Sequence, residues 1–181
     1  MSDQDLRENT YPHIVTEFFT WLLYQSEVDE QRFSIEGIGE VEVLLQDRLS
    51  FQSGAEDSGK AVISGEDAPA SAETKAALIS GKLLTDIKLL LRLEAATYML
   101  TLRGDLLDIG SLKQVNEDLD EPVEVFQEDD SKEAQLLLRM AEYEDIMTIL
   151  RTLFRRFADR RTQEDWHYEE VQEMRRWVHE Q

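Results

Sequence analysis

The feature that most constrains the fold of this chain is a change in the period of its apolar residues. Between residues 41 and 112 these side chains mostly recur at every second position, which is typical of β-strands with one buried face. From residue 136 to residue 157 they recur at intervals of four and three, which is typical of an amphipathic helix. Strands followed by helices predict an α+β protein rather than alternating βαβ units.

The predicted strands form an antiparallel sheet interrupted by turn-rich segments. Alternation resumes after the polar residues 46–48, and the clearest signal is a hairpin that turns near Ala95 and Ala96. A short helix is predicted over residues 71–80 and ended by Gly81, and residues 116–122 are expected to be an acidic loop or edge. The predicted strands cover residues 41–45, 49–51, 60–63, 87–93, 98–102 and 107–112.

Three further helices are predicted, one near the start of the chain and two at its end. Residues 12–26 are apolar around most of a helix and are expected to be buried, with Pro12 in the first turn. A long helix starts near Ser131 and ends near Arg161; its seam must cover the sheet, pack on another helix, or pair with a second subunit. The seam comprises Leu136, Met140, Tyr143, Met147, Leu150, Phe154 and Phe157.

The last predicted helix follows Thr162, which we expect to be its N-cap because Glu164 and Asp165 suit a first turn. Phe154 and the three tryptophans could anchor a partner, but their helical spacing favours a place in the core. The helix should bury one face, comprising His167, Val171, Met174 and Val178, flanked by Trp177.

Charge divides the chain at about residue 130. Residues 1–130 hold 10 basic and 28 acidic side chains, whereas residues 131–181 hold 9 and 11. We therefore describe an acidic α+β sheet domain over 1–130 and a C-terminal helical segment over 131–181, packed together as one structural domain. The net charge of −20 opposes contact with nucleic acid and anionic membranes, except where basic residues gather.

Composition and motifs argue against an enzyme. The absence of cysteine excludes disulfides, thiol catalysis and thiolate metal sites. The start of the chain is unlike a signal peptide, and its longest apolar stretch, residues 14–24, is too short to span a bilayer, which predicts a cytoplasmic protein. We find no phosphate-binding loop, nucleophile motif or calcium-loop pattern and expect no metal and no cofactor. The histidines, His13, His167 and His179, are isolated.

Five arginines lie within residues 151–161, and two interpretations of them stay open. Arg151 and Arg155 lie along one flank of the apolar seam, whereas Arg156 and Arg160 lie further round on the solvent side. They could form a patch that contacts phosphates. They could equally complement the negative end of the helix dipole and pair with carboxylates of the acidic region.

Three blocks together resemble a known family. Residues 17–27, residues 60–113 and residues 138–157 resemble the later part of the recombination-associated RdgC family, and ISGKLLTDIKLLL is the most specific element. The resemblance implies a bacterial, non-enzymatic protein that forms a ring-like dimer around duplex DNA without reading its sequence and restrains the recombinase RecA. It singles out Lys82, in the Gly81-Lys82 step. The chain lacks the N-terminal half of that family, so enclosing DNA would need a different oligomer.

The sequence thus leads to two functional hypotheses. One is nonspecific binding of double-stranded DNA in recombination or replication upkeep, with the protein at the nucleoid. The alternative is an acidic protein–protein interaction module, either a recombinase regulator or a DNA mimic. We also predict a homo-oligomer that forms through residues 136–157. We predict no membrane partner. The predicted DNA-contacting residues are Lys82, Lys88, Arg92, Arg151, Arg155, Arg156 and Arg160.

Overall fold

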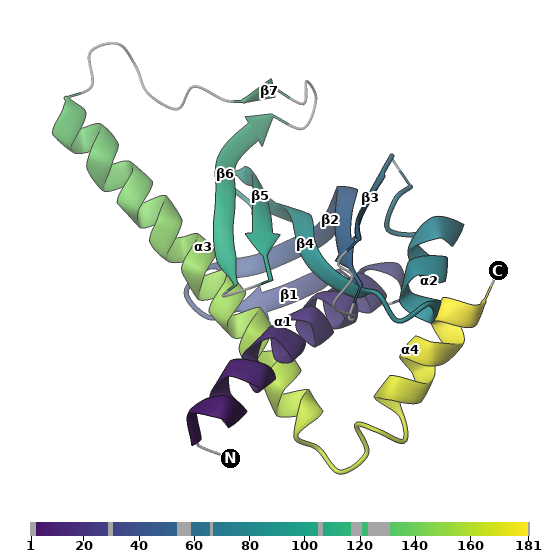
Figure 1. Cartoon of the computed structure of the whole chain (residues 1–181). Helices are drawn as coiled ribbons and strands as arrows, with labels where there is room; N and C mark the ends of the chain where they lie inside the picture. Colours follow the sequence, from purple (N-terminus) through teal and green to yellow (C-terminus); the bar gives the residue numbers. More distant parts are fainter. Residues whose placement is uncertain are drawn as a thin grey trace.

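The structure is a computed structural model of the 181-residue chain, and it has the predicted α+β architecture. A strongly bent antiparallel sheet carries helices on one face, and the longest of them crosses the strands with its second half and extends beyond the sheet with its first half (Figure 1). The structure describes residues 3–28, 31–53, 59–65, 67–104, 107–116, 121–122 and 131–180.

The sheet follows the order β1-β2-β4-β5-β6-β7, with β3 paired to the far end of β2. Every pairing between described strands is antiparallel, because neighbouring strands are joined by turns or by the short helix α2 (Ala72–Ile79). The strands are β1 (Arg32–Ile35), β2 (Gly39–Gln52), β3 (Lys60–Ser64), β4 (Leu83–Arg92), β5 (Thr97–Arg103), β6 (Asp108–Asn116) and β7 (Glu121–Pro122).

The predicted strands are confirmed, with one simplification. The segments at 41–45 and 49–51 belong to one 14-residue strand, β2, and the polar residues between them coincide with a shift of register against β4. Such a shift bends the strand and lets the apolar side chains return to the same face after the polar interruption. The hairpin of β4 and β5 pairs Leu89 with Leu100 and turns where Ala95 and Ala96 predict it.

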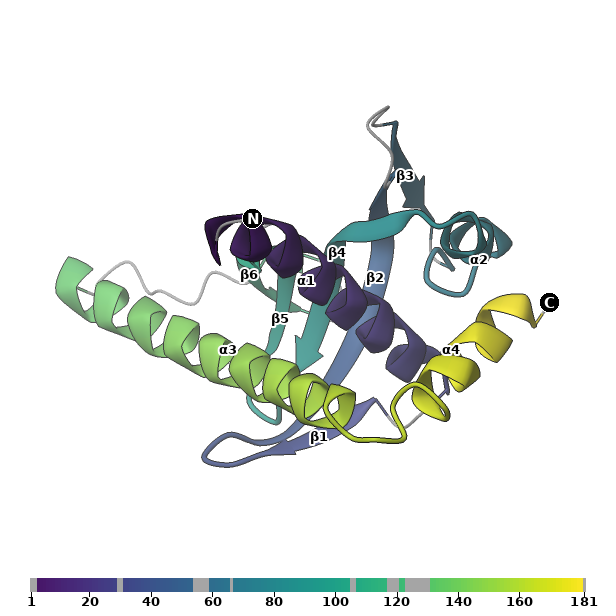
Figure 2. The same ribbon diagram turned by 60° about the horizontal axis from the view of Figure 1, so that its bottom comes forward.

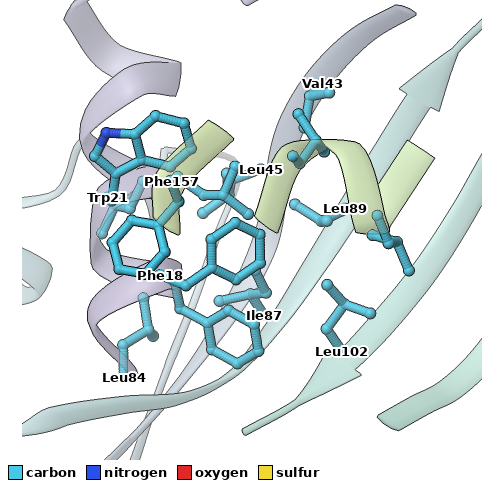
Figure 3. Close-up of a cluster of buried hydrophobic side chains, with 14 of the residues drawn as sticks. Phe18, Trp21, Val43, Leu45, Leu84, Ile87, Leu89, Leu102 and Phe157 are labelled. Atoms are coloured by element: carbon cyan, nitrogen blue, oxygen red, sulfur yellow. The ribbon is translucent and has the colours of Figure 1, made fainter. Parts of the chain in front are cut away.

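Helix α1 (Asp3–Val28) crosses the inner face of the sheet and contacts β4 and β2. It begins nine residues earlier than predicted, so Pro12 lies inside the helix, where it lacks the N–H of a helical hydrogen bond, and not in the first turn. Phe18, Phe19 and Leu23 are fully buried against the sheet. The second half of the long helix α3 (Lys132–Arg161) adds Phe157 to the same core (Figure 3).

The ends of the two shorter helices contrast with each other. The Ser71 side chain caps α2 by accepting from the Thr74 amide, and Gly81 follows at φ +78°, a left-handed conformation that favours glycine. Helix α4 (Glu170–His179) starts eight residues after Thr162, so the predicted N-cap is wrong. The Thr162 hydroxyl instead donates to the Asp159 carbonyl and closes the end of α3, and residues 163–169 form turns.

One continuous core joins α1, the sheet, the second half of α3 and α4. Trp21, Trp166 and Trp177 are each at most 6% exposed, which confirms the prediction that the tryptophans belong to the core. Phe157 contacts both Trp21 and Trp166, at ring-centroid distances of 5.7 and 5.8 Å. His167 lies before α4 and is exposed, so it does not belong to the buried face on which it was predicted.

Candidate interaction surfaces

The two predicted cations of β4 lie on the open face of the sheet, each against a carboxylate of β2. Lys88 Nζ is 3.1 Å from Asp47 Oδ1, and Arg92 Nη1 is 3.0 Å from Glu42 Oε2. Because β2 and β4 are neighbours, residues far apart in the sequence face each other across the strands. A phosphate would have to compete with these carboxylates for both cations.

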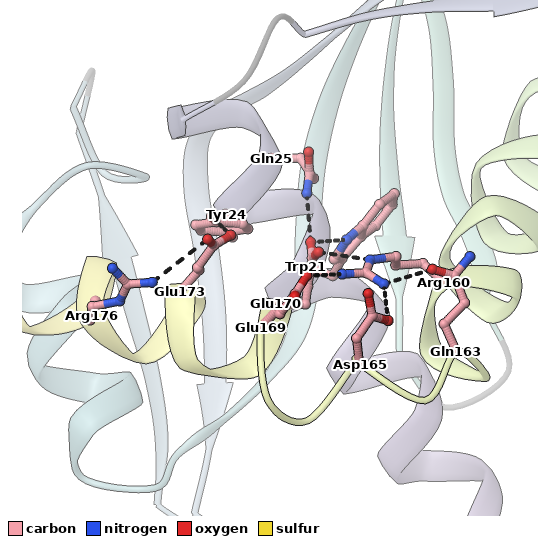
Figure 4. A network of polar contacts seen from close by, with 10 residues as sticks. All are labelled: Trp21, Tyr24, Gln25, Arg160, Gln163, Asp165, Glu169, Glu170, Glu173 and Arg176. Carbon is pink, nitrogen blue, oxygen red and sulfur yellow. Dashed lines mark hydrogen bonds and ion pairs between the residues drawn. The ribbon is translucent and has the colours of Figure 1, made fainter.

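Arg160 is the most fully engaged of the predicted residues. At the end of α3 its guanidinium contacts Asp165 Oδ1 at 2.5 Å, Gln163 Oε1 at 2.7 Å and Glu170 Oε2 at 3.0 Å (Figure 4). The hydrogen bonds to Asp165 and then to Glu170 raise its pKa above the ordinary value for arginine. This network ties α3 to α4 and leaves the side chain only 23% exposed, so Arg160 is a structural residue.

Glu170 links the same network to α1. Its Oε1 atom accepts from the Trp21 indole at 3.2 Å and from the Gln25 amide at 3.0 Å, while Oε2 accepts from Arg160 (Figure 4). On the next turn of α4, Glu173 accepts from the Tyr24 hydroxyl at 3.4 Å. Burial and the nearby Glu173 raise the pKa of Tyr24 above its ordinary 10.0.

The remaining predicted cations do not converge. Arg156 donates to the Ser34 carbonyl at 2.5 Å and lies over the Phe33 ring, which ties α3 to β1. Arg151 and Arg155 are exposed on α3, and Lys82 lines a separate hollow of about 340 Å³ with residues of α1 and α4. The seven residues thus lie on several surfaces, and Lys88, Arg92 and Arg160 already have carboxylate partners.

A different set of cations gathers on the open face of the sheet, in a hollow of about 710 Å³ that we name the basic hollow. Polar side chains of five strands line it, including the hydroxyls of Thr101 and Ser111, which are 3.1 Å apart. Two of its cations form ion pairs, Lys88 with Asp47 and Lys60 with Asp86. Its charged residues are Asp47, Arg48, Lys60, Asp86, Lys88 and Arg103.

Arg48 and Arg103 give the basic hollow its excess of positive charge. Within the described part of the chain neither forms an ion pair. A Cβ atom at Gly110 would lie 2.8 Å from Arg103 Nε, so glycine leaves room for this guanidinium against β6. The sequence prediction missed both arginines, although the register of the predicted hairpin would have placed Arg103 opposite Asp86.

The second candidate surface is the first half of α3, residues 132–145, which we name the projecting half. It extends beyond the sheet in both views of the fold (Figure 1, Figure 2), and none of its side chains is buried. The helix begins at a regular N-cap, because the Ser131 side chain accepts a hydrogen bond from the Ala134 amide. Its large apolar side chains are 48–66% exposed: Leu136, Leu137, Leu138, Met140 and Tyr143.

The predicted seam therefore divides into two parts. In the second half of α3, residues 146–161, which we name the core half, Leu150 and Phe157 are buried and Phe154 is half-buried against the core. The three seam residues of the projecting half contact no described part of the core. An exposed cluster of this kind is typical of surfaces that bind another protein.

The described residues offer no group of three His, Asp or Glu side chains that could hold a metal ion. In that same part of the chain, no helix has the length and apolar character needed to cross a membrane. Most of the acidic segment 116–122 lies outside the described residues. No protein-family model matches the sequence, and neither a curated protein nor a solved structure is significantly similar to it.

Proposed function

We propose that the protein is a non-enzymatic interaction module that binds a protein partner through the projecting half of α3. The observation that carries this proposal is the 48–66% exposure of five large apolar side chains within eight residues. The apolar side of a helix commonly docks into a groove of a partner protein, where leucine, methionine and tyrosine supply the buried contacts. Covering these side chains would remove apolar surface from water, which favours association.

The resemblance to the RdgC family supports a recombinase such as RecA as the partner, in bacterial recombination or replication upkeep in the cytoplasm. The net charge of −20 supports the same class of partner. A DNA-binding protein presents a positive surface, and a strongly acidic chain is attracted to it over long range. On this proposal the apolar helix gives the contact its stability, and the carboxylates occupy a place that DNA would otherwise take.

The test is a titration of the fluorescently labelled chain with purified RecA, followed by anisotropy. The double variant Leu137→Glu/Leu138→Glu should weaken binding at least tenfold, because it places two charges where apolar contacts form. Thr148→Glu is the matched control, since it adds a charge to an exposed position of the same helix outside the projecting half. Equal binding by wild type and the double variant, or no binding by either, would contradict the proposal.

The basic hollow supports a second candidate function, nonspecific binding of double-stranded DNA at the nucleoid. Its four cations against two aspartates give a local surplus of positive charge on a protein whose net charge is −20. A polar, concave surface suits a phosphate backbone when, as for Arg48 and Arg103 among the described residues, its arginines form no ion pair. Guanidinium groups donate paired hydrogen bonds to phosphate oxygens. The candidate contacts become Arg48, Lys60, Lys88 and Arg103, of which only Lys88 was predicted from the sequence.

A titration of labelled duplex DNA at low and moderate salt tests this second function. Binding should weaken steeply with salt and be lost in Arg48→Ala/Arg103→Ala. The control, Arg151→Ala/Arg155→Ala, removes the same charge from α3 and should bind like wild type. Loss of binding in the control alone would locate the contact on α3 instead, and no binding at low salt would exclude the function.

A further inference from the structure

Four apolar side chains of α3 form a continuous stripe, which we name the apolar stripe. Leu136, Met140 and Tyr143 are exposed, and the next member, Met147, is half-buried and lies outside the core cluster. At 100° per residue, the stripe lies about 90° around the helix from the side that faces the core. A second helix could therefore cover the stripe without displacing any core contact.

The stripe is complementary to itself when two copies run in opposite directions. A two-fold axis between Met140 and Tyr143 places Met140 opposite Tyr143 of the second copy. The same axis places Leu136 opposite Met147 at each end. The spacing of four, three and four residues is the one with which paired helices interlock their side chains. An isologous contact of this kind closes at two copies and does not continue into a fibre.

Charge favours the same antiparallel arrangement. Glu133 and Arg151 project on the same flank of the stripe and lie at nearly equal distances on either side of the proposed axis. Each glutamate would thus face the arginine of the other copy, and both residues are exposed in the single chain. A parallel pair would hold these opposite charges roughly 27 Å apart along the helices.

The charges along the whole of α3 are also distributed unevenly between its two halves. The projecting half carries four acidic and two basic residues, whereas the core half carries one acidic and five basic residues. Antiparallel pairing about the proposed axis opposes the two helix dipoles favourably and brings Arg151 of the core half beside Glu133 of the other copy. The other acidic residues of the projecting half, Glu142, Glu144 and Asp145, lie near the axis. Parallel pairing would set like charges alongside each other.

From these observations we infer that two copies of the chain associate through the apolar stripes of α3 in an antiparallel pair. The inference goes beyond the proposed function, because it names a second copy of the chain as an occupant of the same half of α3. Leu138 lies on the far side of the helix from the stripe and stays exposed in such a pair. The contact uses four apolar residues from each copy, so the association should be reversible and depend on protein concentration.

Sedimentation velocity over a wide range of protein concentration is the first test. Wild type should shift from monomer to dimer, whereas Met140→Glu should stay a monomer because it buries two charges beside the axis. Leu138→Glu is the matched control, since it makes the same kind of change in the same half of the helix and should dimerise like wild type. A wild-type monomer at every concentration would overturn the inference, as would equal effects of the two variants.

Cross-linking through introduced cysteines tests the antiparallel direction. Because the chain has no cysteine of its own, no native thiol can form a competing disulfide. An oxidised mixture of Leu136→Cys and Met147→Cys should form a disulfide-linked heterodimer, because these positions face each other. Leu136→Cys alone should not cross-link, since its two copies would lie roughly 16 Å apart. Cross-linking of Leu136→Cys alone would indicate a parallel pair and contradict the inferred arrangement.

Charge reversal separates this inference from the proposed function. Glu133→Arg should weaken the dimer severalfold, and adding Arg151→Glu should restore it. A failure of restoration would contradict the inferred pairing of the flanks. Should the chain stay monomeric while Leu137→Glu/Leu138→Glu still loses RecA binding, the self-pairing is wrong and the proposed function stands. Dimerisation without any binding to RecA would support the self-pairing and contradict the proposed function.

Discussion

The two halves of α3 have the same pattern of apolar residues and opposite surroundings. In the core half, Ile146, Ile149 and Leu153 are fully buried, whereas Leu136 and Leu137 in the projecting half are 60% and 66% exposed. The difference arises because α1 and the sheet lie against only one end of the helix (Figure 2). A heptad pattern therefore indicates that one side of a helix can pack against another element. Whether it does so within the chain depends on which elements the fold places beside that helix.

The largest expected effect is in the core half. Phe157→Ala should lower the free energy of unfolding by about 3–5 kcal/mol, because Phe157 is fully buried and contacts Phe18, Trp21 and Trp166. Leu138→Ala in the projecting half should change it by less than about 0.5 kcal/mol. Denaturant unfolding monitored by circular dichroism measures both, and similar losses would remove the distinction between the halves.

The next effect concerns two arginines near the end of the helix. Arg160→Met should lower the free energy of unfolding by about 1–3 kcal/mol, because Asp165 and Glu170 lose their charged donor. Arg155→Met should stay within about 0.5 kcal/mol, since this arginine is exposed. Equal stability of the two variants would mean that the network around Glu170 contributes nothing to joining α3 with α4.

A local measurement distinguishes the halves further. Ala141→Gly should destabilise the projecting half by about 1 kcal/mol, since glycine is a poor helix former. Amides of that half should then exchange about fivefold faster in dilute protein, with global unfolding unchanged. Ala158→Gly should instead lower global stability, because the core half unfolds with the rest of the molecule. A global loss from Ala141→Gly would show that the halves unfold together.

The smallest effect is at the point where α3 leaves the sheet. Burial raises the pKa of Tyr98 on β5 above 10.0, and the nearby Glu142 and Asp145 of α3 raise it further. The folded protein therefore keeps this proton after an unfolded tyrosine has lost it, so stability should fall as pH rises from about 10 through the folded pKa. Glu142→Gln/Asp145→Asn should lower the pKa of Tyr98 and weaken this dependence.

Tyrosine-selective NMR titration measures the Tyr98 pKa directly. Tyr98→Phe is the control, because it removes the ionisable hydroxyl and should abolish this part of the alkaline loss of stability. An unchanged pKa in the double variant would mean that α3 passes farther from β5 than the structure places it.

Several parts of the fold could be predicted because their signals are local. The short helix that begins near Ser71, its stop at Gly81 and the turn near Ala95 depend on residues only a few positions away. The start of α4 was less predictable, although α3 ends at Arg161 as predicted. The hydroxyl of Thr162 can cap the end of one helix or the start of the next, and here it closes α3. The contacts of Arg160 with Asp165 and Glu170 then hold the following residues in turns.

The candidate sites were less predictable than the fold, because they depend on strand register. Arg92 meets Glu42 fifty residues away, and Arg48 and Lys60 reach the basic hollow only because β2 and β3 pair at its edge. The charge of each residue is visible in the sequence, but the neighbour that neutralises it is not. The predicted set therefore included Arg160, which holds the fold together, and omitted Arg48 and Arg103.

The sequence alone determined the types and order of the elements, because apolar period and turn chemistry act within a few residues. It also determined that the second half of the chain would carry one long amphipathic helix. Only the tertiary structure decided which part of that helix is covered and which cations are neutralised. The physical reason is that burial and ion pairing depend on distances between segments that are remote in sequence, and the packing of α1, the sheet and α3 sets those distances.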